Sequence, residues 1–121
     1  MRDHSASLAF LRVERDMHVS GLKYAFTWTG PYAPVLSFPG RVYAVGIRFD
    51  DDADEELETH LLADQIQEAV LDSAQVGPSR TWPLAARGTS PLWARVRDGI
   101  AVWESADRSE RYRIGELPAG K

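Results

Sequence analysis

The chain has 121 residues, of which 44% are hydrophobic, 26% charged and 10% aromatic, and its formal net charge is −4. This length and balance are typical of one globular domain and exclude a disordered or fibrous chain. The absence of cysteine excludes disulfides, thiolate zinc sites and cysteine nucleophiles.

The sequence predicts a single domain over residues 1–121. It divides into a strand-rich part (1–49), an acidic helix (50–76) and a second strand region that contains a hairpin (80–117). No apolar run has the length of a membrane span or a signal peptide, so we expect a cytoplasmic protein without a membrane partner.

The net charge conceals a segregation along the chain. Residues 50–72 contain ten acidic residues and no Lys or Arg, whereas the remainder has 14 basic and 8 acidic residues and a charge of +6. Separated charge of this kind affects association rather than fold. It indicates either a solvated acidic helix or a surface for a partner of opposite sign.

The first half of the chain contains two segments with the pattern of a strand. Residues 7–13 are apolar at nearly every position, but the run is too short for periodicity to separate a strand from a helical turn. Apolar and aromatic residues then alternate with other residues over 22–29 and again over 43–49, which is typical of strands with one buried face. Between them, residues 35–38 form a short apolar segment, which a turn signal at Pro39-Gly40 follows.

A helix is predicted over residues 54–74. Asp51 or Asp52 would cap its first turn, and Gly77-Pro78 would follow its end. At 100° per residue one arc of this helix is apolar or small and should face the sheet; its members are Leu62, Ala63, Ile66, Ala69, Val70 and Ser73.

Three leucines lie on the opposite side of this helix. Leu57, Leu61 and Leu71 are interleaved there with Asp64 and Glu68. Either other parts of the chain cover these leucines, or the five residues form an acidic, leucine-containing contact surface for another protein. We therefore take Leu57, Leu61, Asp64, Glu68 and Leu71 as candidate partner-binding residues.

The C-terminal region predicts a hairpin over 92–104, because Asp98-Gly99 favours a two-residue type I′ turn. A further strand is expected over 111–114. Together these elements predict an α+β fold, with a mainly antiparallel sheet of five or six strands and one long helix packed on a face. The expected core residues are Leu22 or Ala25, Phe26, Val45, Ile47, Phe49, Leu62, Ile66, Val70, Val96 and Trp103.

Catalytic and metal-binding motifs are scarce. The three histidines lack the spacing of a zinc site, and His60 on the acidic helix is expected to be solvated. Asp50, Asp52 and Asp54 resemble the start of a calcium loop, but Glu55 stands where such a loop needs glycine. We predict no catalytic residue, cofactor or metal and favour a non-enzymatic protein; an enzyme would need a buried polar cluster between helix and sheet.

Aromatic and basic residues of the C-terminal region give an alternative site. Trp82, Trp93, Arg95 and Arg97 could bind a small ligand or single-stranded nucleic acid by stacking and phosphate contacts. Interspersed acidic residues support a different interpretation, in which these arginines form cross-strand ion pairs on the sheet.

Four short segments also carry a resemblance. They are Thr81-Trp82-Pro83-Leu84, Ser90-Pro91-Leu92, Asp98-Gly99-Ile100-Ala101-Val102-Trp103 and Ile114-Gly115-Glu116-Leu117. This C-terminal third resembles small uncharacterised proteins of high-GC bacteria with a Trp-Pro … Gly-x-Ala-Val-Trp … Ile-Gly-x-Leu tail. The Cys and His residues of that pattern are absent here. The resemblance implies a bacterial origin and no mechanism.

The leading functional hypothesis is an interaction module. Its acidic, leucine-containing helix would bind a basic protein, as small acidic bacterial proteins of the immunity or antitoxin kind neutralise a basic nuclease or toxin. A homodimer, in which the helix of one copy meets the arginines of the other, is the second form of this hypothesis.

Overall fold

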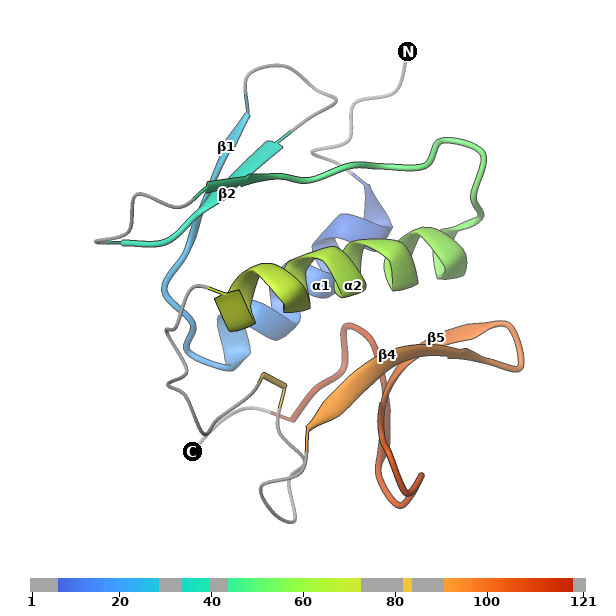
Figure 1. Ribbon diagram of the computed structural model, residues 1–121. Helices are drawn as coiled ribbons and strands as arrows, with labels where there is room; N and C mark the ends of the chain where they lie inside the picture. Colours follow the sequence, from blue (N-terminus) through green and yellow to red (C-terminus); the bar gives the residue numbers. More distant parts are fainter. Residues whose placement is uncertain (1–6, 29–33, 40–43, 73–81, 84–90, 119–121) are drawn as a thin grey trace.

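The computed structural model describes residues 7–28, 34–39, 44–72, 82–83 and 91–118, and this part contains two helices and two three-stranded antiparallel sheets. The predicted α+β class and antiparallel pairing are confirmed. The prediction of one larger sheet with a single long helix is wrong, because the first apolar run forms a helix that packs beside the acidic helix. Figure 1 shows this helix pair between the two sheets.

Helix α1 (Leu8–Val19) settles the ambiguous N-terminal run. Its N-cap is Ser7, whose hydroxyl oxygen accepts a hydrogen bond from the backbone N of Phe10 at 3.3 Å. Helical spacing places five residues of α1 on one buried face: Ala9, Phe10, Val13, Asp16 and Met17.

Helix α2 (Glu55–Asp72) confirms the predicted acidic helix, although the cap is Asp54, not Asp51 or Asp52. An Asp54 carboxylate oxygen accepts a hydrogen bond from the backbone N of Leu57 at 2.8 Å. The predicted inward arc is buried, apart from Ser73, which lies outside the described residues. The arc is wider than expected because α2 packs on α1 as well as on β4 and β5. Within the described residues, neither helix combines the length and apolarity needed to cross a bilayer.

The first sheet has the order β1 (Ala25–Trp28), β2 (Pro34–Ser37), β3 (Ala44–Gly46). Its aromatic side chains pack against α1, with the ring of Phe10 4.8 Å from that of Phe26 and 5.2 Å from that of Trp28. Leu22 and Phe26 therefore face inward, and Ala25 is exposed. Tyr43, the first residue of the strand predicted over 43–49, lies outside the described part.

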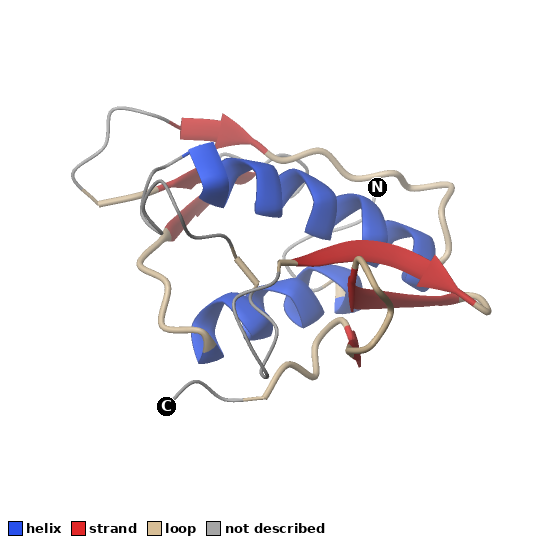
Figure 2. Cartoon of the chain, turned by 60° about the horizontal axis from the view of Figure 1, so that its bottom comes forward, coloured by secondary structure: helices blue, strands red, loops and turns tan. Residues whose placement is uncertain are grey.

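The second sheet has the order β4 (Leu92–Arg97), β5 (Ile100–Ser105), β6 (Arg111–Arg113). The predicted hairpin is confirmed, with φ of 51° at Asp98 and 77° at Gly99, as a type I′ turn requires. Val96 is 39% exposed, so its place in the predicted core is wrong. The tip of the hairpin projects beyond the N-terminal end of α2 (Figures 1 and 2).

Asp16 of α1, which is 0% exposed, binds the chain after β6 by hydrogen bonds. Its carboxylate accepts hydrogen bonds from Trp103 Nε1 at 2.9 Å, from the backbone N of Gly115 at 2.6 Å and from that of Leu117 at 3.1 Å. Gly115 has φ of 103°, and a Cβ there would lie 3.0 Å from the Cβ of Arg12. The close approach of this segment to α1 therefore requires glycine.

Candidate functional site

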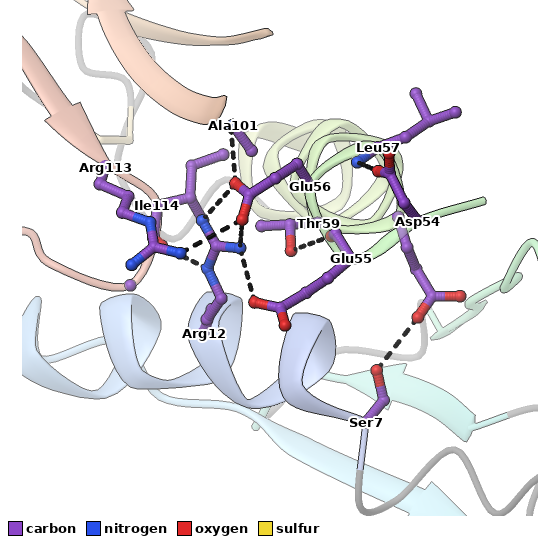
Figure 3. A network of polar contacts seen from close by, with 12 residues as sticks. Ser7, Arg12, Asp54, Glu55, Glu56, Leu57, Thr59, Ala101, Arg113 and Ile114 are labelled. Atoms are coloured by element: carbon purple, nitrogen blue, oxygen red, sulfur yellow. Dashed lines mark hydrogen bonds and ion pairs between the residues drawn. The ribbon is translucent and has the colours of Figure 1, made fainter. Parts of the chain in front are cut away.

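The acidic residues of α2 fall into two groups, of which the first is used inside the molecule. Figure 3 shows Arg12 of α1 between Glu55 and Glu56. Arg12 Nη1 lies 3.0 Å from Glu55 Oε2 and 2.9 Å from Glu56 Oε2. Glu56 also accepts hydrogen bonds from Arg113 at 3.2 Å and from the backbone N of Ala101 at 2.9 Å. These contacts join α2 to α1 and to the second sheet.

This environment keeps Glu56 ionised. Partial burial opposes its charge, but hydrogen bonds from Arg12, from the Ala101 backbone and from Arg113 outweigh that effect and lower the pKa of Glu56 from 4.5 to about 2. Glu58 is also withdrawn from solvent, since it is 3% exposed and accepts a hydrogen bond from Ser7 Oγ at 3.1 Å. These carboxylates thus have partners within the chain, although the side chain of Glu55 stays 40% exposed.

The second group forms a stripe on the outer side of α2. Asp64, Glu68 and Asp72 are exposed, and their spacing of four residues places them along one side of the helix. None of the three forms an ion pair within the part of the chain that the structure describes. Their charges face solvent.

The three leucines differ in exposure. Leu57 is 43% exposed, and Figure 3 shows it on the side of α2 away from Arg12. Leu61 and Leu71 are half-buried. The structure thus brings Leu57, Leu61, Asp64 and Glu68 to the outer side, with part of the leucine surface covered by the molecule itself.

A groove lies beside this stripe, where the extended segment after β3 runs along α2 (Figure 1). Gln65 fixes the segment, because its side chain accepts a hydrogen bond from the backbone N of Arg48 at 2.8 Å and donates one to the Arg48 carbonyl at 2.7 Å. The groove has a volume of about 300 Å³ and is lined by Arg48, Phe49, Asp50, Leu61, Asp64, Gln65 and Glu68. Phe49 and Leu61 give the groove an apolar part, and three carboxylates stand against one guanidinium.

The predicted arginine site lies on the outer face of the second sheet. The strand register places Trp93 opposite Glu104, and Glu104 opposite Arg111, on the face that also carries Arg95 and Arg97. Glu104 is 2% exposed, and it accepts hydrogen bonds from Arg97 and Arg111 that hold its pKa below its ordinary value in spite of burial. The predicted cross-strand ion pairs exist, but they centre on a buried carboxylate.

Two residues lie elsewhere than the sequence indicated. Trp82 is 4% exposed and packs edge to face on Trp103, with ring centroids 5.3 Å apart, so the structure does not bring it to the face of Trp93. His60 is half-buried rather than solvated, and its Nδ1 is enclosed without a hydrogen-bond partner among the residues that the structure describes. The buried arc of α2 is wide, and it places the part of the helix around His60 against the second sheet.

Buried polar groups serve the fold. Gln67, 3% exposed, donates hydrogen bonds to the carbonyl oxygens of Trp82 at 3.0 Å and Leu92 at 2.7 Å, and Asp16 binds the C-terminal segment. Among the described residues no three His, Cys, Asp or Glu side chains are grouped as metal ligands. These arrangements position elements of the chain and do not line a cavity.

Sequence reasoning missed the residues that connect the elements, Arg12, Asp16 and Arg111. A signal was present for Asp16: once residues 8–19 are read as a helix, it falls on the same face as Val13 and Met17. An acidic residue on an apolar face indicates a buried hydrogen-bond acceptor. No comparable signal marks Arg12, whose partners lie far away in the sequence.

Comparison of the chain with known proteins gives no match among protein-family models, curated proteins or solved structures.

Proposed function

We propose that this protein is a non-enzymatic interaction module that binds a basic protein partner through the outer side of α2. The observation that carries the proposal is the groove between α2 and the segment after β3. It combines apolar walls, from Phe49 and Leu61, with the carboxylates of Asp50, Asp64 and Glu68.

The division of the acidic residues supports a partner of positive charge. If the acidic residues of α2 only increased solubility, we would not expect them to divide into one group paired within the chain and another group at the surface. In α2, Glu55 and Glu56 are paired within the chain, while Asp64 and Glu68 have no ion pair with any residue that the structure describes and lie beside half-buried Leu61. Opposite charge across such a surface speeds association and excludes partners of like charge.

The shape of the groove favours a lysine or arginine side chain as the inserted group. The methylene stem of such a residue can pack on Phe49 and Leu61 while its charged end reaches Asp64 or Glu68. Leu57, 43% exposed along the same helix, adds an apolar contact beyond the groove. An apolar centre with charged groups around it is the usual arrangement of a protein interface.

A direct test uses a fluorescent amphipathic peptide of lysine and leucine as the basic probe, with binding followed by anisotropy at low ionic strength. Replacing both groove acids, Asp64→Asn with Glu68→Gln, should weaken binding by about tenfold, and Leu57→Gln by about threefold. The matched controls remove the same groups elsewhere: Asp98→Asn in the hairpin turn, and Leu11→Gln at a helical leucine that is 45% exposed. Both controls should bind as the unaltered chain does.

Equal losses in the test and control variants would contradict the proposal, because they would mean that any surface charge or leucine serves. Sedimentation of the chain alone tests the alternative, in which a second copy of the chain binds to the groove. A monomer at low and at high salt agrees with a foreign partner. A salt-sensitive dimer that Asp64→Asn dissociates would identify a second copy as the occupant instead.

A further inference from the structure

The outer face of the second sheet concentrates positive charge in a chain that is acidic overall. Arg95 and Arg97 of β4 and Arg111 of β6 stand on this face, with Glu104 between them on the central strand. By the same register Arg113 of β6 also lies on this face, but it pairs with Glu56 and Glu116. The other three guanidinium groups have one carboxylate among them, which leaves the face positive, while the whole chain has a net charge of −4.

Glu104 holds two of these guanidinium groups in place. Its Oε1 accepts hydrogen bonds from Arg97 Nε at 3.0 Å and Nη2 at 2.8 Å, and its Oε2 accepts one from Arg111 Nε at 2.8 Å. Within the described part of the chain, no hydrogen bond occupies the Nη1 group of either arginine. Each arginine is thus positioned by one edge and presents the other to solvent, as preorganised recognition of an anion requires.

Arg95 differs from its neighbours, since it has no carboxylate partner in the described residues. Its Nη1 donates only to the adjacent carbonyl of Ala94 at 2.9 Å, and the residue is exposed. Beside it on β4, two residues away and on the same face, lies the half-buried indole of Trp93. Val102, 4% exposed, lies directly opposite Arg95 on the neighbouring strand and on the same face.

From this arrangement we infer that the outer face of β4, β5 and β6 binds single-stranded nucleic acid. Arg95, Arg97 and Arg111 contact phosphates, and Trp93 stacks on a base. Guanidinium groups around an aromatic ring on a sheet match the two chemical features of a single strand, its charged backbone and its flat bases. The site is separate from the groove on α2, so the inference does not rest on the proposed function.

The test is a titration of the intact chain with a labelled oligothymidylate of about 12 nucleotides, the length that such faces cover. Binding is read from anisotropy and from tryptophan emission at low ionic strength. Arg95→Gln should lower the slope of log affinity against log salt by about one, as expected for one lost phosphate contact. Trp93→Ala should weaken binding by about fivefold or more, through lost stacking.

Arg48→Gln is the matched control, because Arg48 is also exposed but lies in the acidic groove. It should leave both affinity and salt slope unchanged. Thermal melts of each variant show whether it is folded, and Arg95→Gln, at an exposed position, keeps the test decisive if Trp93→Ala is unstable. Absence of binding, equal effects of Arg95→Gln and Arg48→Gln, or equally tight binding of inorganic polyphosphate would each overturn the inference.

Discussion

Asp16 shows how one side chain can organise distant parts of this chain. Its carboxylate is 0% exposed and binds Trp103, Gly115 and Leu117, which lie some 90 to 100 residues further along the sequence. Arg15 adds an ion pair to the carboxylate at 2.9 Å and donates to the carbonyl of Leu117 at 2.8 Å. An ionised carboxylate that accepts several N–H groups is worth more than a neutral acceptor of the same shape.

We therefore predict that Asp16→Asn lowers the free energy of unfolding by about 3 kcal/mol, because the amide nitrogen faces donors and the charge that they stabilise is lost. Denaturant unfolding followed by fluorescence measures the change. Asp64→Asn, the same substitution at an exposed position, should change stability by less than about 0.5 kcal/mol. Equal effects of the two substitutions would show that Asp16 does not hold the C-terminal segment.

Helix α2 is the element through which α1 and the second sheet pack together. One side contacts α1 and the other contacts β4 and β5, and its large apolar residues Leu62, Ile66 and Val70 are 0% exposed. Burial of each such side chain contributes about 1.5–3 kcal/mol. The helix thus joins both sheets to one core, and the outer stripe is the part of it left to solvent.

Ile66→Asp tests this assignment of the helix faces. A charge in place of Ile66 should cost about 4 kcal/mol or more, which is close to the whole stability of a small domain, so the variant should not fold stably. Circular dichroism during heating measures the outcome. Leu57→Asp, on the outer side of the same helix, should melt within a few degrees of the unaltered chain; a folded Ile66→Asp would mean that the faces are reversed.

The sequence predicted those elements whose signals are local. The period of α2 and the Asp98-Gly99 turn depend on neighbouring residues, and both are confirmed. α1 stayed ambiguous because its apolar run continues through residues that become helical only when Phe10 packs on Phe26 and Trp28. The division into two sheets was missed for the same reason, since it follows from where α1 lies.

The candidate sites follow a similar rule. That Asp64 and Glu68 lie on the outer side of α2 could be predicted from helical spacing. The groove could not, because it depends on the segment that Gln65 fixes by hydrogen bonds to Arg48. Likewise Glu104 and Arg111 meet only through strand pairing, and Trp82 is buried by its contact with Trp103.

Across the whole molecule, some charged residues form ion pairs within the chain and others face solvent. Ion pairs among Arg12, Arg113 and the first turn of α2 join the elements, and Glu104 neutralises part of the second sheet. The charged residues that face solvent include the acidic stripe on α2 and the positive face of the second sheet. A molecule so divided is suited to associate through faces of opposite sign.

We propose that the outer side of α2 is a docking surface for a basic partner. Backbone amide chemical shifts of the isotopically labelled chain, recorded during titration with the lysine–leucine peptide, test it most directly. We expect chemical-shift changes only at residues 48–50 and at Leu57, Leu61, Asp64, Glu68 and Leu71. The Asp64→Asn, Glu68→Gln double variant should show none of these changes. Shifts of equal size around Asp98, Asp107 and Glu116, at acidic positions remote from the groove, would contradict it.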